Sequence, residues 1–160
     1  MYEVRDNFLS LYDCKMMIAY YKDNYDKSYF WQPNETRPLI INHTFPWLDK
    51  KIMDWVAEMD NRDLYIRANE IVEWQTGTKM NEHTDLYCDL WSAIIYLNDD
   101  FTGGITILED GTQIVPKTGK CMLFKGNKIK HHVTEVSGIR YTIPYWIGIS
   151  DSHTISIGER

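Results

Sequence analysis

The sequence predicts a mainly β protein of the α+β type, in which a β core is supported from outside by two N-terminal helices. Two observations lead to this class. Apolar residues recur at helical spacing within residues 1–62, and from Leu64 onward they alternate with a period of two. Short strand-like segments separated by glycine-containing turns then follow one another, as they do in β-sandwiches and barrels.

Two helices are expected before the β region. The first is predicted over residues 6–22, with Asp6 or Asn7 as its N-cap. The second is predicted over Pro46–Met59, because Pro46 suits a first helical turn and apolar residues follow at helical spacing. The polar and aromatic segment between them, about residues 22–37, is predicted to be a loop.

The β region is expected to consist of short strands separated by turns. The predicted strands are Leu64–Trp74, Lys79–Asp85, Leu90–Leu97, Ile105–Leu108, Thr112–Val115, Lys120–Phe124, His131–Val136 and Arg140–Ile149. No linker, repeat or low-complexity tract interrupts the chain. We therefore expect residues 1–160 to form a single domain, with helical support over about 1–62 and the β core over about 64–157.

The composition is that of a soluble globular protein. Hydrophobic residues make up 44% of the 160 residues and charged residues 25%. The net charge of −6 argues against a nucleic-acid partner, since such proteins usually carry a net positive charge or a basic stripe. The sequence contains no apolar run long enough to cross a membrane.

The cysteines and the N-terminal residues favour the cytoplasm. The three cysteines are widely spaced, odd in number and without a C-x-x-C pair, so they indicate neither a disulfide framework nor a zinc site. Reduced thiols are typical of a reducing compartment. The first residues include no apolar stretch of the kind found in signal peptides, which agrees with a cytoplasmic location.

A candidate metal site begins with the pattern His83-x-Asp85. Side chains two residues apart point the same way in an extended chain, so both can face one ion. The pattern is common by chance, but barrel closure could bring a later histidine, His131 or His132, beside it. Two histidines and one carboxylate on one face of a metal are the ligand set of non-haem Fe(II) oxygenases.

Arg140 adds a candidate anion site. It is the one charged residue in the mostly apolar stretch 138–146. A charged side chain is rarely buried without a partner, and the planar guanidinium group of arginine matches a carboxylate. Thr142 lies two residues further on, so it shares the same face of the predicted strand and can add a hydroxyl donor. A metal site and an anion site are therefore predicted together.

These motifs resemble those of the Fe(II)- and 2-oxoglutarate-dependent dioxygenases, and most of all their prolyl 4-hydroxylase branch. The resemblance covers most of the chain. It includes the N-terminal segment from Asp6, the series Trp74, Gly77, Met80, His83 and Asp85, the strand and double-glycine turn from Tyr96 to Thr106, and the closing blocks from Gly119 to Phe124 and from His131 to Thr142. Two of these blocks, one with His83 and Asp85 and one with His131 and Arg140, are specific in combination.

The resemblance implies a jelly-roll fold, the double-stranded β-helix, and a set of roles for the candidate residues. His83, Asp85 and His131 would hold Fe(II), and His131 is chosen over His132 because the family's distal ligand typically lies nine positions before such an arginine. Arg140 would bind the distal carboxylate of 2-oxoglutarate, with Tyr96 and Thr142 assisting. The implied reaction consumes O2 and hydroxylates a C–H bond of a prolyl residue in a peptide or protein. Succinate and CO2 are the coproducts, and ascorbate is the expected reductant.

Several alternatives stay open at this point. The substrate could instead be a free amino acid or a small metabolite, and nucleic-acid demethylases of the same superfamily share the histidine and aspartate pattern. A non-catalytic β-barrel that binds or supports another molecule is the alternative from a different class. The chain also departs from the family pattern, since Trp74 and Met80 occupy positions that are usually tyrosine.

Overall fold

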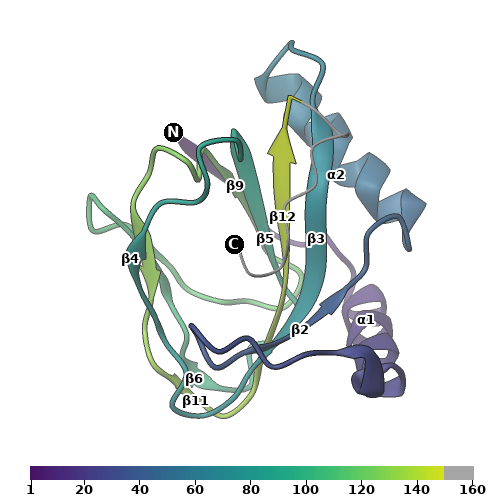
Figure 1. Ribbon diagram of the computed structural model, residues 1–160, viewed down its shortest axis with the longest axis vertical. Coiled ribbons are helices and arrows are strands. Elements are labelled where there is room, and N and C mark those ends of the chain that lie inside the picture. Colours follow the sequence, from purple (N-terminus) through teal and green to yellow (C-terminus); the bar gives the residue numbers. More distant parts are fainter. Residues whose placement is uncertain (150–160) are drawn as a thin grey trace.

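The computed structural model describes residues 1–149 and consists mainly of antiparallel strands, with two α-helices (Figure 1). The helices are α1 (Leu11–Asp23) and α2 (Pro46–Met59), and a 3-10 turn, η1, lies at Tyr25–Lys27. The strands are β1 (Tyr2–Arg5), β2 (Arg37–Ile40), β3 (Tyr65–Trp74), β4 (Met80–His83), β5 (Trp91–Tyr96), β6 (Thr102–Gly103), β7 (Thr106–Leu108), β8 (Gln113–Ile114), β9 (Cys121–Phe124), β10 (His131–Val133), β11 (Val136–Ser137) and β12 (Arg140–Gly148).

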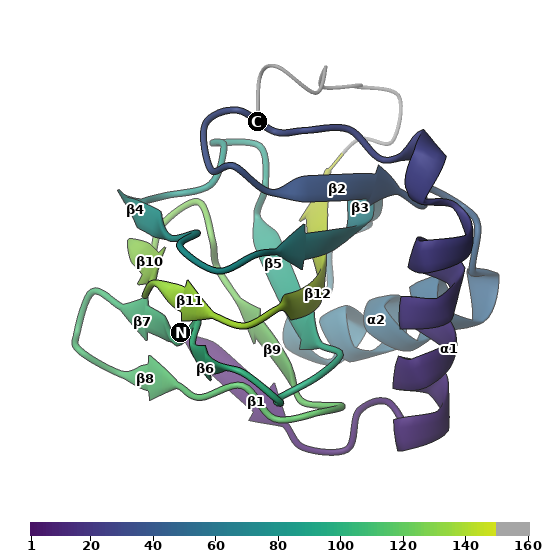
Figure 2. The ribbon, with the colours of Figure 1, turned by 90° about the horizontal axis from the view of Figure 1, so that it is seen from below.

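The strands are arranged in layers. A six-stranded sheet has the order β1-β9-β5-β12-β3-β2, a four-stranded sheet has the order β4-β10-β7-β8, and β11 pairs with β6. Figure 2 shows helices α1 and α2 on one side of the larger sheet and the four-stranded sheet on its other side. The predicted mainly β class, with a β core and two supporting helices, is confirmed.

Strand β12 shows how the period-two pattern separates a core from a cavity. It pairs with β3 along one edge and with β5 along the other. Every second side chain packs with the helices in the main hydrophobic core: Tyr141, Ile143, Tyr145 and Ile147. The alternate side chains line a cavity on the opposite face: Arg140, Thr142, Pro144 and Trp146. The alternation therefore presents polar groups to the cavity without disturbing the core.

The predicted start of the first helix is wrong, as is its predicted cap. Helix α1 begins at Leu11, and the hydroxyl of Ser10 accepts a hydrogen bond from the amide of Asp13 at 3.0 Å. Asn7 has a φ of +56°, in the left-handed region, so the chain cannot be helical there. The next residue, Phe8, is buried in the core before the helix begins. Helix α2 has the predicted bounds.

Two four-residue strands, β1 and β2, were not predicted. Both lie within the region expected to be helical support, and neither has a clear alternating pattern of its own. Their partners define them: β1 pairs with β9, and β2 pairs with β3. The predicted strand 131–136 also differs, because it divides into β10 and β11. Such short strands depend on distant partners, which local sequence does not specify.

The remaining expectations concern the end of the β region, the cysteines and the absence of a membrane span. The predicted β region extends to residue 157, and its last part lies outside the described residues. Cys14, Cys88 and Cys121 are free thiols. Within residues 1–149, neither helix has the length and the continuous apolar character that a membrane span requires.

Candidate active site

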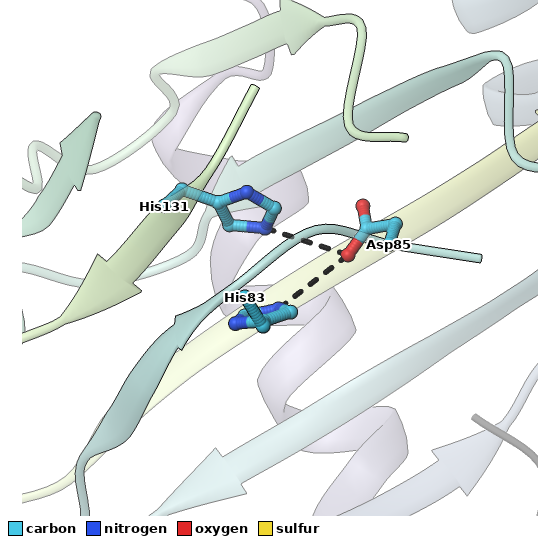
Figure 3. Close-up of side chains that lie close together, drawn as sticks. All are labelled: His83, Asp85 and His131. Carbon is cyan, nitrogen blue, oxygen red and sulfur yellow. Dashed lines mark ion pairs between the residues drawn. The ribbon is translucent and has the colours of Figure 1, made fainter. Parts of the chain in front are cut away.

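The three predicted metal ligands lie together where β4 ends and β10 begins (Figure 3). These strands are antiparallel neighbours, and His83 is the direct cross-strand partner of His131. Asp85 lies two residues beyond β4, where its amide donates to the carbonyl of Gly126 at 2.8 Å. This hydrogen bond holds the chain so that the Asp85 carboxylate lies close to both imidazole rings.

The ligand atoms face one another. Oδ1 of Asp85 lies 3.5 Å from Nε2 of His83 and 3.4 Å from Nε2 of His131. One ligand atom from each residue can be chosen so that all lie within 4.8 Å of one another. Two imidazoles and one carboxylate at this spacing form a donor set that suits non-haem Fe(II) and leaves other positions on the ion open.

Backbone carbonyls fix the orientation of both imidazole rings. Nδ1 of His83 lies 2.8 Å from the carbonyl oxygen of Asn81, and Nδ1 of His131 lies 2.8 Å from that of Ile129. A carbonyl can only accept, so each Nδ1 carries the proton and donates. Each Nε2 then faces Asp85, and it is the atom that offers a lone pair to a metal once it has given up its own proton.

Two residues that the sequence analysis did not single out hold the carboxylate of Asp85. The hydroxyl of Ser92 donates a hydrogen bond to Oδ2 at 2.5 Å, so that Oδ1 is the oxygen that faces the two imidazole rings. A Cβ atom at Gly126 would collide with both Oδ2 of Asp85 and Oγ of Ser92. The sequence does contain one signal for Ser92, since Ser92 has the only side-chain hydroxyl among residues 90–95 of the predicted apolar strand. The sequence contains no comparable signal for the close approach of Gly126 to Asp85.

The electrostatics of the cluster favour an ionised aspartate. Burial alone would raise the pKa of Asp85, but hydrogen bonds from His131, His83 and Ser92 hold it well below its usual range. Burial alone would lower the pKa of His83, but the hydrogen bond and the charge of Asp85 raise it above its usual value. The carboxylate is thus charged at neutral pH and ready to bind a cation.

The two adjacent histidines point to different faces of β10, so only one of them can belong to the site. His131 is 4% exposed and lies on the wall of the cavity. His132 points to the other face of β10, where it is half-buried, and it is not among the described residues that line the cavity. Of the two, His131 alone lies beside His83 and Asp85.

Arg140 lies in the same cavity, with its side chain fully inside the protein. It is 1% exposed, and its Nε donates to the carbonyl of Gly104 at 3.0 Å. The guanidinium group contacts two aromatic rings, with its central carbon 4.5 Å from the ring centroid of Trp74 and 5.5 Å from that of Tyr96. Among the described residues, Nη2 of Arg140 has no hydrogen-bond partner. It is a buried cationic donor with room for an anion.

Burial lowers the pKa of Arg140 to about 10, so the group still carries its charge at neutral pH. The second glycine of the double-glycine turn makes its position possible. Gly104 has a φ of +62°, and a Cβ atom there would press on the side chains of Arg140 and Phe101. The absence of a side chain at Gly104 leaves the guanidinium group its place against Trp74.

The other two predicted cosubstrate residues lie next to Arg140. Thr142 is buried, lines the cavity and pairs directly with Tyr96 across β12 and β5. The hydroxyl of Tyr96 is 2.7 Å from that of Thr106, and either can donate. If Thr106 donates, the hydrogen of Tyr96 is available to an anion beside Arg140.

A single cavity of about 400 Å³ connects the histidine and aspartate cluster with Arg140. Its size lies in the range that holds a small organic molecule. The unpaired donor of Arg140 suits one carboxylate of a dicarboxylic acid, and the three ligand atoms suit a metal that such an acid could chelate. The described residues therefore fit both Fe(II) and 2-oxoglutarate.

Comparison with known proteins identifies the family. The model of the 2OG-Fe(II) oxygenase superfamily matches residues 68–148, which include all the residues of the candidate site. The chain belongs to this superfamily. No curated protein matches it by sequence. The family membership makes Fe(II) and 2-oxoglutarate the metal and the cosubstrate of this oxygenase, while the residues that bind them remain predictions.

Solved structures confirm the double-stranded β-helix fold. The collagen prolyl hydroxylase of Paramecium bursaria Chlorella virus-1, in complex with 2OG, is 18% identical with a TM-score of 0.75, over 91% of this chain and 94% of that one. A prolyl hydroxylase from Trichoplax adhaerens, in complex with a peptide fragment of hypoxia inducible factor, is 15% identical with a TM-score of 0.80, over 92% and 83%. HygX from Streptomyces hygroscopicus, with nickel, 2-oxoglutarate and hygromycin B, is 11% identical with a TM-score of 0.73, over 99% and 89%.

Proposed function

We propose that this oxygenase hydroxylates an unactivated C–H bond of a prolyl residue in a peptide or protein, and that residues 1–160 act as one catalytic domain. The observation that carries the proposal is the presence, in one cavity, of the cluster His83, Asp85 and His131 and of the buried Arg140. The first matches the ligand set for Fe(II), and the second supplies a charged donor for a carboxylate.

In this proposal His83, Asp85 and His131 hold Fe(II). The metal, when bound, supplies the reaction with O2 that converts 2-oxoglutarate to succinate and CO2 and oxidises the substrate. The carbonyls of Asn81 and Ile129 hold the proton of each neutral imidazole on Nδ1, which leaves Nε2 as the atom that binds the metal. The apolar walls of the cavity exclude water and hold the substrate C–H bond near the metal.

Arg140 binds the distal carboxylate of 2-oxoglutarate, and Tyr96 and Thr142 donate hydroxyl hydrogen bonds to it. The contacts of Arg140 with the rings of Trp74 and Tyr96 keep the guanidinium group in place before the anion arrives. We further propose ascorbate as the reductant that restores Fe(II) after unproductive turnover. The free cysteines suit the reducing cytoplasm in which we expect the enzyme to work.

The prolyl substrate is favoured by the two prolyl hydroxylases of the same fold, one of which is described with a peptide bound. A small-molecule substrate is the second candidate, because HygX has the same fold and is described with hygromycin B bound. Peptide libraries and metabolite mixtures, incubated with the enzyme and analysed by mass spectrometry for one added oxygen that depends on 2-oxoglutarate, separate the two.

The first test is spectroscopic. Anaerobic addition of Fe(II) and 2-oxoglutarate to the protein should give a weak visible charge-transfer band. The band requires metal and cosubstrate to bind together, so it reports on the site without a known substrate. A protein with the correct circular dichroism spectrum and no band would rule out the proposed oxygenase site.

The second test distinguishes the two adjacent histidines. We expect His131→Ala to abolish the band and the formation of succinate, because it removes one ligand from the cluster. His132→Ala is the matched control and should retain most of both, because His132 lies on the other face of β10. Loss in the control variant together with retention in His131→Ala would reverse the assignment of the ligand.

A further inference from the structure

The turn after β5 contacts the start of β12, where Arg140 lies. Strands β5 and β12 are antiparallel, with Tyr96 paired to Thr142. When this register is extended by two residues, Asn98 lies opposite Arg140. The ladder stops short of them, because β5 ends at Tyr96. Arg140 therefore has a strand partner on the β3 side, where it pairs with Trp74, and a turn on the other side.

The side chain of Asn98 replaces the missing strand contact. Its Oδ1 accepts a hydrogen bond from the amide of Tyr141 at 2.8 Å, and its Nδ2 donates to the carbonyl of Ile139 at 2.8 Å. These roles are fixed, because a main-chain amide can only donate and a carbonyl can only accept. The two groups belong to the two peptide units on either side of Arg140. Nδ2 also donates to Oδ1 of Asp100 at 2.8 Å, which ties the amide group to its own turn.

The same turn also holds the side chain of Arg140. The carbonyl of Gly104 accepts a hydrogen bond from Nε of Arg140 at 3.0 Å. Between the two ends of the turn, the side chain of Phe101 lies so close to Gly138 that a Cβ atom there would collide with it. Residues 98–104 thus contact Arg140 twice, at its main chain through Asn98 and at its guanidinium group through Gly104.

The guanidinium group of Arg140 requires this support because its charge is deeply buried. The side chain is 1% exposed, and among the described residues Nη2 has no hydrogen-bond partner. A binding group of this kind has to be held within about 0.5 Å of its productive position. The guanidinium group lies at the end of a long side chain, so small rotations of the flanking peptide units displace it by more than they displace the main chain.

We propose that Asn98 is a positioning residue for the cosubstrate, which fixes the main chain at Arg140 so that the guanidinium group meets the distal carboxylate of 2-oxoglutarate. Asn98 is not among the described residues that line the cavity, so it acts through Arg140. The inference rests on the proposed role of Arg140 and adds a residue outside the cavity that determines cosubstrate affinity. A merely structural role in the turn would change stability and leave the preference for a distal carboxylate unaltered.

The test measures how strongly the protein prefers a 2-oxo acid with a distal carboxylate. 2-Oxoglutarate and 2-oxopentanoate share their chain length and their 2-oxo acid group, but the second ends in a methyl group. Each is titrated anaerobically into the full chain saturated with Fe(II), and binding is followed through the visible charge-transfer band and tryptophan fluorescence. We expect Asn98→Ala to weaken the binding of 2-oxoglutarate by about tenfold and that of 2-oxopentanoate by about twofold or less. The affinity for Fe(II) alone should stay the same.

Asn24→Ala is the matched control. Nδ2 of Asn24 also donates to a main-chain carbonyl, that of Tyr20 at 2.9 Å, but at the end of α1 and apart from the described residues of the cavity lining. This variant should keep the affinity for both acids. Asn98→Ser, whose side chain is too short to reach both peptide units, serves as a second variant should Asn98→Ala fail to fold, with the same direction of change. Hydrogen exchange of the Tyr141 amide in the metal-free protein, which both Asn98 variants should accelerate, reports the contact directly.

Equal weakening of the two acids would mean a general loss of structure and would overturn the inference. Faster exchange of the Tyr141 amide with an unchanged preference for 2-oxoglutarate would also overturn it, because the contact would then exist without positioning Arg140. A wild-type protein that gives neither a band nor a fluorescence change with 2-oxoglutarate contradicts the oxygenase proposal itself. That result is obtained before any variant is compared, so the two failures are distinguishable.

Discussion

At the scale of single residues, the candidate metal site depends on how one carboxylate is held. Asp85 lies beyond the end of β4, so the strand itself does not fix its direction. Its amide bonds to Gly126, and Ser92 occupies Oδ2, so that Oδ1 faces the two imidazoles. A hydrogen-bond partner of this kind orients a ligand before the metal arrives and so strengthens metal binding.

Ser92→Ala should weaken Fe(II) binding by about 10- to 100-fold, because the carboxylate loses the donor that selects its rotamer. The measurement is an anaerobic titration with Fe(II) at saturating 2-oxoglutarate, followed through the visible charge-transfer band. Ser137→Ala is a suitable control, since Ser137 is exposed on β11 and away from the site. An unchanged affinity in Ser92→Ala would show that Asp85 is oriented by its backbone alone.

At the scale of secondary-structure elements, the start of α1 is decided by a single side chain. Ser10 caps the helix through the amide of Asp13, and the residues before it turn away because Asn7 is in the left-handed region. We expect Ser10→Ala to lower the free energy of unfolding by about 1 kcal/mol. Denaturant unfolding measures this, and Asp6→Ala should leave stability nearly unchanged, since Asp6 is exposed before the helix. A larger loss of stability in Asp6→Ala than in Ser10→Ala would instead support the cap predicted from the sequence.

The elements also show what local sequence can and cannot specify. Helix α2 and the long strands β3, β5 and β12 have strong apolar periodicity, and their predicted positions agree with the structure within about two residues. Strands β1 and β2 are short and are defined by distant partners, which no local pattern contains. The same is true of Gly126, which approaches Asp85 from a turn 41 positions later in the chain.

At the scale of the whole molecule, the candidate site joins the two sheets. His83 and His131 belong to the four-stranded sheet, whereas Arg140 and Thr142 belong to the six-stranded sheet. Their proximity follows from closure of the barrel, so periodicity alone could suggest a barrel but could not decide between His131 and His132. The resemblance to a family chose His131, and the face of β10 agrees with that choice.

A metal and a cosubstrate that bind both sheets should stabilise the folded protein as a whole. Ligands present at about 100 times their dissociation constant stabilise the native state by about 2.7 kcal/mol, which corresponds to a rise in Tm of about 5–10 °C for a domain of this size. We expect this rise on anaerobic addition of Fe(II) with 2-oxoglutarate, measured by thermal unfolding, and its reversal by a chelator. His131→Ala should lose most of the rise, and His132→Ala should keep it. An equal rise in both variants would mean that the ligands stabilise the protein from another site.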